Sequence, residues 1–157
     1  MGLDRAKRIE FNMEIEKLSD ENCNDLIHLV LELWEDCSFE EELASYSGII
    51  DSETETCYLV KEKGNYIAFV HISIRNDYVE GSNDLPVAYI EAIYVKPNDQ
   101  KRGIARILIN VAENWAIQKG LCQLASDTSI ANETSIEFHK KVGFTEVERI
   151  VCFIKDL

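Results

Sequence analysis

One stretch of the chain, from Val95 to Arg106 (VKPNDQKRGIAR), has the residue types and the spacing of a phosphate-binding turn. Pro97 ends the preceding apolar run because it lacks a backbone donor, and Gly103 relieves side-chain crowding where backbone N–H groups must face an anion. The start of a helix then offers unpaired N–H groups and the positive end of the helix dipole. Three basic side chains add positive charge: Lys101, Arg102 and Arg106. A solvated basic loop before a helix is the alternative interpretation of the same residues.

Two carboxylates stand out by their positions in the chain, and a carboxylate is able to bind a cation or accept a proton. Glu91 interrupts the apolar run Ala88–Ile93, where burying it unpaired would cost on the order of several kcal/mol, so its side chain must face solvent, a partner or a pocket. Alternation along a strand predicts that Glu91 shares one face with three residues: Tyr89, Ile93 and Val95. Asp127 lies just after a predicted buried strand, the position at which open α/β sheets bind ligands. The alternatives are an exposed strand glutamate and an aspartate that caps a turn.

A later segment with helical spacing carries Asn132 and His139. Asn132 is placed to cap this helix. An imidazole side chain is in general able to act as an acid near neutral pH, which makes His139 a candidate acid, and a surface helix histidine is the alternative. The histidines at positions 28, 71 and 139 lack carboxylates at ligand spacing, so no metal is expected. Cys122 and Cys152 lie in apolar, strand-like runs without an evident base, which disfavours a covalent relay through cysteine.

The composition indicates one globular domain. The 157 residues fit a single domain, and the 46% of hydrophobic residues form no run near the ~20 that a membrane helix needs. The charged residues 1–8 precede no apolar signal core, so we expect a cytoplasmic protein. A net charge of −13 disfavours binding to nucleic acid and to anionic membranes. Five cysteines without Cys-x-x-Cys spacing indicate neither a disulfide framework nor a zinc site.

Hydrophobic periodicity predicts the elements that must position these residues. Strands are expected at 11–16, 57–61, 66–75, 87–95 and 121–125, with two more short strands between Phe144 and Ile154. Helices are expected at 26–37, after the Ser38-x-x-Glu41 capping box, at 104–115 with a stop at Gly120, and at 134–142. The order β-α-α-β-β-β-α-β-α-β-β predicts an α/β protein of the α+β type, with a mixed, mostly antiparallel central sheet and helices on both faces.

Two ordered motifs give the chain a resemblance to a known superfamily. Gln100-x-x-Gly103-x-Ala105 is followed by Asn132-x-x-Ser135-x-x-x-His139-x-x-x-Gly143-Phe144. Together with the element order, they resemble the GNAT superfamily of acyl-CoA-dependent N-acetyltransferases from Met13 onward. Four segments are also similar to the aminoglycoside 6′-N-acetyltransferases within it: Leu33-Trp34, Ser73–Gly81, Tyr89–Val95 and Ala125–Asp127. We therefore expect a single GNAT domain over residues 13–157, and residues 1–12 are an extension if Met13 is the natural start.

The resemblance implies acetyl-CoA as the donor and an amine of a cationic amino sugar as the acceptor. In that family the backbone of the turn holds the CoA pyrophosphate, and the pantetheine arm lies beside the fourth strand like an added strand. His139 replaces a tyrosine that the superfamily usually places near the CoA sulfur, which leaves its role as an acid open. The resemblance assigns contacts with CoA to these residues: Ile93, Val95, Gln100, Lys101, Arg102, Gly103, Ile104, Ala105, Arg106, Asn132 and His139.

For the acceptor, the resemblance implies direct acetyl transfer to the 6′-amine of aminoglycoside antibiotics, which confers resistance. The implied catalytic residues are Asp127, Glu91 and His139, with Asp127 anchoring and deprotonating the amine and Glu91 binding it or ordering a water. The implied acceptor contacts are Trp34, Tyr78, Glu91 and Asp127, and core packing is the alternative for Trp34. Because family members are often dimers, we expect a homodimer. Two other functions remain open: acetylation of another polyamine or a protein amine, and a noncatalytic acyl-CoA-binding sensor.

Overall fold

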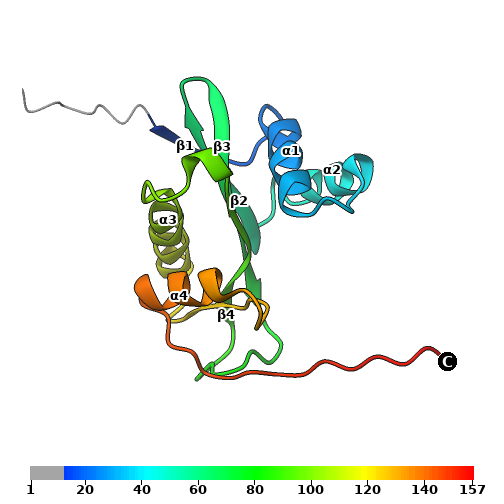
Figure 1. Ribbon diagram of the computed structural model, residues 1–157, viewed down its shortest axis with the longest axis vertical. Coiled ribbons are helices and arrows are strands. Elements are labelled where there is room, and N and C mark those ends of the chain that lie inside the picture. The colour runs from blue at the N-terminus through cyan, green and yellow to red at the C-terminus, as the bar shows by residue number, and fades with distance from the viewer. Residues whose placement is uncertain (1–12) are drawn as a thin grey trace, which may run out of the picture.

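A five-stranded sheet in the order β1-β2-β3-β4-β5 forms the centre of the computed structural model, which describes residues 13–157 (Figure 1). The strands are β1 (Met13–Lys17), β2 (Glu55–Glu62), β3 (Asn65–Arg75), β4 (Val87–Val95) and β5 (Leu124–Ser126). The strands β1 to β4 are antiparallel to one another in chain order, and β5 is parallel to β4. This confirms the predicted mixed, mostly antiparallel sheet. The extension expected over residues 1–12 lies outside the described residues.

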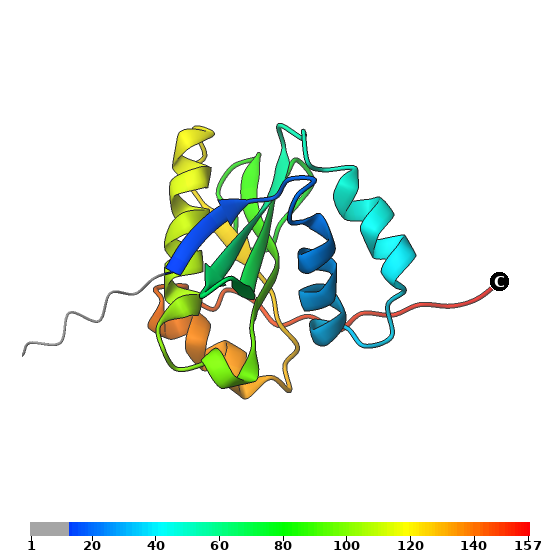
Figure 2. The ribbon, with the colours of Figure 1, turned by 90° about the horizontal axis from the view of Figure 1, so that it is seen from above.

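Helices cover both faces of the sheet, as predicted (Figure 2). The helices α1 (Cys23–Leu33) and α2 (Phe39–Ser47) pack on one face, and α3 (Ile104–Gln118) and α4 (Glu133–Lys141) pack on the other. Each face has its own apolar cluster, because inward side chains alternate along the strands between the two sides. Every helix within residues 13–157 is too short or too polar to span a membrane.

Two side-chain caps predicted from the sequence fix helix starts. The hydroxyl oxygen of Ser38 accepts a hydrogen bond from the backbone N–H of Glu41 at an N···O distance of 3.4 Å and so caps α2. The side-chain oxygen of Asn132 accepts from the backbone N–H of Ser135 at 3.0 Å and caps α4. Each cap satisfies one of the N–H groups that a helix start leaves unpaired.

The last segment differs from the prediction of two strands between Phe144 and Ile154. Residues 144–157 form no helix or strand, and their end extends away from the body of the molecule (Figure 1). The side chains of Phe153 and Ile154 are 92% and 96% exposed. A strand needs a neighbouring strand to pair its N–H and C=O groups, and this segment has none within residues 13–157. Cys122 and Cys152, expected in apolar strands, are exposed and outside the strands.

A cavity of about 480 Å³ lies beside β5, the strand at one edge of the described sheet. All of β5 lines it, together with the end of α3 and the segment from Phe144 to Val147. The segment 144–147 therefore lies across an open space from β5 and is not paired with it.

Candidate active site

The strands β4 and β5 separate after a short stretch of pairing. Residues 88–90 of β4 pair with residues 124–126 of β5, whereas β3 pairs with β4 as far as Val95. The edge of β4 from residue 91 to 95 that faces away from β3 thus has no partner strand in the described part of the chain. An open edge can bind an extended ligand as an added strand. This geometry is compatible with the predicted main-chain contacts of Ile93 and Val95, although Gln100 Nε2 donates to the Val95 carbonyl oxygen at 3.2 Å.

A β-bulge in β4 sets the direction of Glu91. The ladder pairs successive residues of β3 with Ile90 and Ala92, so Glu91 between them is the extra residue. The bulge shifts the alternation of the strand, and Ile93 and Val95 join the apolar cluster on the α3 side of the sheet. Glu91 instead meets polar side chains of β3 on the α1 and α2 side. The prediction that Glu91 shares a face with Ile93 and Val95 is wrong for this reason.

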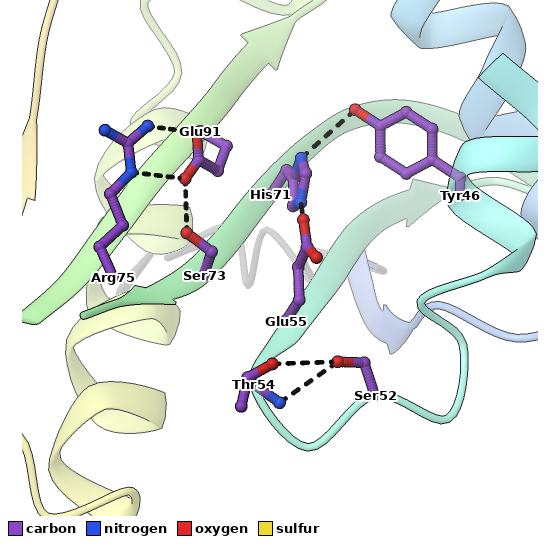
Figure 3. A network of polar contacts seen from close by, with 8 residues as sticks. All are labelled: Tyr46, Ser52, Thr54, Glu55, His71, Ser73, Arg75 and Glu91. Carbon is purple, nitrogen blue, oxygen red and sulfur yellow. Dashed lines mark hydrogen bonds and ion pairs between the residues drawn. The ribbon is translucent and has the colours of Figure 1, made fainter. Parts of the chain in front are cut away.

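The Glu91 carboxylate is held by two donors from β3 (Figure 3). Arg75 donates from Nε to Oε1 at 2.9 Å and from Nη2 to Oε2 at 2.7 Å, and the Ser73 hydroxyl donates to Oε1. Burial alone would raise the pKa of Glu91, but the hydrogen bonds from Arg75 and Ser73 and the charge of Arg75 outweigh burial, so the pKa lies below its ordinary value. Glu91 is therefore ionised at neutral pH and is a poor base.

Asp127 is linked to the same cluster through a tyrosine. The buried Tyr89 donates its phenolic hydrogen to Asp127 Oδ1 at 2.7 Å. Burial, and then the hydrogen bond to Asp127, raise the pKa of Tyr89, which remains a neutral donor. The guanidinium carbon of Arg75 lies 3.4 Å from the centre of the Tyr89 ring. Glu91, Arg75, Tyr89 and Asp127 therefore form one continuous chain of contacts that joins the two predicted carboxylates.

The turn after β4 exposes backbone donors at the start of α3. Gly103, with φ of 82°, is the N-cap residue of α3, and no side chain caps this helix start. A Cβ built on Gly103 would meet nothing within 4 Å, so crowding inside the protein is not why glycine is needed there. The left-handed backbone requires it, and the open space leaves room for a ligand. The start of α3 therefore has the uncapped N–H groups that the predicted anion site requires, and the anion site itself stays a prediction.

One of the three basic side chains of the turn, Arg102, differs from its predicted role. Arg102 binds Glu62 Oε1 and Asp99 Oδ1, each at 2.7 Å, so two carboxylates neutralise the charge that the sequence suggested for an anion. Arg106 donates to the backbone carbonyl of Lys141 at 3.1 Å and ties α3 to the end of α4. Lys101 is exposed, with φ of 60°. The prediction that Arg102 supplies free positive charge is therefore wrong.

His139 lies in the last turn of α4, and its side chain reaches the end of β5. Its Nδ1 is 2.7 Å from the carbonyl oxygen of Ser135, which can only accept, so Nδ1 carries the hydrogen. Its Nε2 lies 2.9 Å from the hydroxyl of Ser126, the last residue of β5. In the neutral ring Nε2 is an acceptor, and only the protonated ring can donate a hydrogen from this atom. The structure thus places His139 beside the gap between the strands.

Two aromatic residues predicted to contact the acceptor present their rings to solvent. Trp34 is 41% exposed, and Tyr78, in the loop between β3 and β4, is 75% exposed. Because α1 ends at Leu33, Trp34 follows the helix as its C-cap, and the predicted helix over 26–37 is too long. Core packing, the alternative for Trp34, does not account for this exposure.

Arg75 and Tyr89 join the site in the structure, whereas sequence reasoning assigns no chemistry to either. Arg75 is the last residue of β3, and Tyr89 pairs with Ser73 across the ladder. A charged residue ending one apolar strand, together with a carboxylate in the next strand, is the signal that predicts such a pair. To apply this signal, one must know which residues of the two strands lie opposite each other, and the bulge alters that register.

The described chain thus has a mixed sheet whose fourth and fifth strands separate after residue 90, and its helix α3 begins without a side-chain cap. The chain belongs to the Acetyltransferase (GNAT) family, whose model matches residues 15–144. This confirms the superfamily that the two sequence motifs suggested.

Curated relatives and solved structures agree with this family. The chain is 36% identical to an aminoglycoside N(6′)-acetyltransferase type 1 of Serratia marcescens over 138 residues, which cover 87% of this chain and 94% of the relative. A protein of the same name from Salmonella typhimurium is 32% identical and covers 91% of this chain and 99% of its own length. The solved structure of AAC(6′)-Iy in complex with the bisubstrate analog CoA-S-monomethyl-acetylneamine is similar to this chain with a TM-score of 0.88 and 32% identity, covering 92% of this chain and 99% of its own.

Proposed function

We propose that the protein transfers the acetyl group of acetyl-CoA to the 6′-amine of an aminoglycoside, by direct attack of the amine within a ternary complex. Acetylation removes a positive charge from the antibiotic and so confers resistance. The observation that carries the proposal is the link between Glu91 and Asp127 at the point where β4 leaves β5. The names of relatives that are 32% and 36% identical over most of both chains support the same acceptor.

Acetyl-CoA supplies an activated thioester, and we propose that the open edge of β4 and the start of α3 hold it. The backbone N–H groups from Gln100 to Ala105 would bind the pyrophosphate, which the uncapped helix start and the open space at Gly103 suit. The main chain of Ile93 and Val95 would hold the pantetheine arm. The side-chain amide of Asn132, whose oxygen caps α4, retains its N–H₂ group for the same arm.

In the proposed reaction, Asp127 holds the acceptor ammonium and takes one proton, which leaves the nitrogen a lone pair for attack on the thioester carbonyl. The nitrogen loses its second proton as the amide forms, and the departing thiolate gains one. His139 in its protonated form is placed to donate the proton to the sulfur, and it then regains a proton from the nitrogen; contact with the sulfur is its alternative role. Glu91, already paired with Arg75, contributes to the orientation of the acceptor. The exposed rings of Trp34 and Tyr78 offer faces to the sugar rings.

The regiochemistry is tested with two acceptors that differ at one atom. With tobramycin or kanamycin, the enzyme should release CoA thiol, whereas an analogue with a 6′-hydroxyl should react at less than ~10⁻³ of that kcat/KM, because the hydroxyl offers neither the charge nor the nucleophile. Mass spectrometry of the product locates the acetyl group. Acetylation of both compounds at another amine contradicts the 6′ assignment. Turnover only on simple polyamines or peptides points to a different acceptor, and CoA binding without turnover on any amine points to a sensor.

A second prediction concerns the CoA turn and has a matched control. Gly103→Val should weaken acetyl-CoA binding at least about tenfold, because a branched side chain enters the space beside the helix start and strains the left-handed backbone by roughly 1–3 kcal/mol. Gly64, in the hairpin between β2 and β3, has the same φ of 82° and equally open surroundings. Gly64→Val should therefore cost similar stability and leave acetyl-CoA affinity unchanged. Equal CoA affinity in the two folded variants, measured by calorimetry, contradicts the proposed pyrophosphate site.

We also propose that the protein is a homodimer in which each chain's last segment pairs with β5 of its partner. Residues 148–157, called the tail below, contain β-prone apolar residues: Ile150, Val151, Phe153 and Ile154. The tail is exposed, β5 is an edge strand, and an open cavity lies beside it. A strand inserted there would cover the apolar tail and supply hydrogen bonds to the edge strand. A twofold axis makes the exchange reciprocal.

We propose that the protein is located in the cytoplasm, because its cysteines are unpaired. All five lie in the described residues as free thiols, and Cys122 and Cys152 are exposed. Unpaired, exposed thiols suit a reducing compartment, which favours the cytoplasm.

A further inference from the structure

Arg75 occupies a place in the site that neither the CoA turn nor the acceptor chemistry requires by itself. Its guanidinium holds both oxygens of Glu91 and covers the face of the Tyr89 ring, whose hydroxyl binds Asp127. The Arg75 side chain is 40% exposed and that of Glu91 is 26% exposed, so solvent and ligands can reach the pair. One cation thus lies within a chain of contacts that has a carboxylate at each end, Glu91 and Asp127.

The number of uncompensated charges determines how readily a bound ammonium loses its proton. A carboxylate near an ammonium group stabilises its charged form and raises its pKa, and two carboxylates do so more strongly. An amine that remains protonated has no lone pair with which to attack. A site with Glu91 and Asp127 both unpaired would therefore bind a polycation tightly and react with it slowly.

We propose that Arg75 is a positioning residue that cancels the charge of Glu91, so that the acceptor ammonium meets a single uncompensated carboxylate, Asp127, and gives up its proton to it. The inference rests on the proposed acetyl transfer to an amine. Through its contact with the Tyr89 ring, Arg75 also fixes the phenol that orients Asp127. The bidentate geometry suits this role, because a guanidinium fixes both oxygens of a carboxylate at once.

The other titratable groups around Glu91 are few. His71 of β3 lies on the same side and donates from Nε2 to Glu55 Oε1 at 2.7 Å, while its Nδ1 lies 3.4 Å from the hydroxyl of Tyr46 in α2 (Figure 3). Tyr89 and Asp127 complete the set. His71 and its partners Glu55 and Tyr46 are left unchanged in every variant proposed below.

Arg75→Gln tests the inference through opposite changes in kcat and in acceptor binding. We expect the acceptor KM to fall severalfold, because the site gains a negative charge, and kcat to fall about ten- to a hundredfold, because the amine keeps its proton. Without Arg75, the pKa of Glu91 and that of the bound ammonium both rise. The acidic limb of the pH profile, which is the fall of kcat toward low pH, should therefore move to higher pH by about one unit. A residue with only a structural role would not tighten acceptor binding.

Three further variants make the test specific. Arg75→Lys keeps the positive charge but cannot form the bidentate hydrogen bonds to Glu91. Compared with Arg75→Gln, it should have an acidic limb close to that of the wild type and a partly recovered kcat. The double variant Arg75→Gln with Glu91→Gln removes both charges and should restore the wild-type limb and KM, even if the single variant fails to fold. Lys119→Gln breaks the surface ion pair with Glu53 and removes one positive charge, as Arg75→Gln does. It should change neither the acidic limb nor the acceptor KM, so it controls for net charge.

The outcomes separate the inference from the proposed function. Acceptor affinity measured by calorimetry does not depend on turnover, so it is read for every variant. Unchanged affinity and an unmoved acidic limb in Arg75→Gln, or a limb that stays shifted in the double variant, overturn the inference and leave the acetyltransferase assignment intact. A wild-type protein that neither binds nor acetylates any amine overturns both.

Discussion

Asp127→Asn should lower kcat by roughly 10²–10⁴-fold and leave acetyl-CoA affinity unchanged, because an amide can neither take the proton of the acceptor nor balance its charge. Tyr89 can still donate its hydrogen bond to the side-chain oxygen of asparagine, so the local structure should persist. Steady-state kinetics with a 6′-amine acceptor and calorimetry with acetyl-CoA measure the two quantities separately. Asp51→Asn, an exposed aspartate in the loop between α2 and β2, makes the same chemical change away from the site and should be silent.

Glu91→Gln should cost less in turnover than Asp127→Asn, since Arg75 already neutralises Glu91 and keeps its pKa low. The loss should appear mainly in acceptor KM and remain within about tenfold in kcat. Equal and large losses of kcat in both variants would mean that Glu91 shares the proton transfer. Wild-type kinetics in both variants on every amine tested would refute the proposed mechanism.

Phe153→Asp should weaken the dimer by at least about a hundredfold in Kd, because it places a charge where the proposed dimer buries an aromatic ring. In a lone chain the side chain of Phe153 is 92% exposed, so the same substitution would have no effect on a monomer. A dimer with exchanged tails and a monomer therefore predict different results for this one variant. Sedimentation velocity over a range of protein concentrations gives the Kd directly.

Lys155→Gln is the matched control for the tail. It changes the net charge by the same amount and lies two residues further along, but it replaces one polar side chain by another. This variant should dimerise as the wild type does. A monomeric wild-type protein, or a Phe153→Asp variant that dimerises normally, would rule out tail exchange and leave the catalytic proposals unaffected.

The elements with long, regular patterns could be predicted from the sequence. The bounds of β4 agree with the apolar run Val87–Val95, and α3 begins where the turn around Gly103 predicts. The caps at Ser38 and Asn132 also agree, because a cap depends on residues that are neighbours in the chain. The same locality explains why the backbone of the turn around Gly103 could be anticipated.

The features that the sequence did not predict depend on residues that are distant in the chain. The bulge at Glu91 is a property of two strands and their register, and the apolar pattern of β4 alone contains no sign of it. Arg102 looked like a free cation because Glu62, its partner, lies at the end of β2. The tail has the composition of a strand, but composition does not specify which edge, or which chain, provides the partner.

The bulge also determines how this site can change in evolution. Glu91 is the one residue of β4 without a place in the ladder, and the residues on either side of it alternate regularly between the two layers of the fold when it is left out. The carboxylate is therefore an addition to the strand, and the sheet does not need it. Insertion of a single codon is enough to supply it to a regular strand, and its deletion removes the acid while each neighbour keeps its layer. Chemistry at this position can be gained or lost without rebuilding the core.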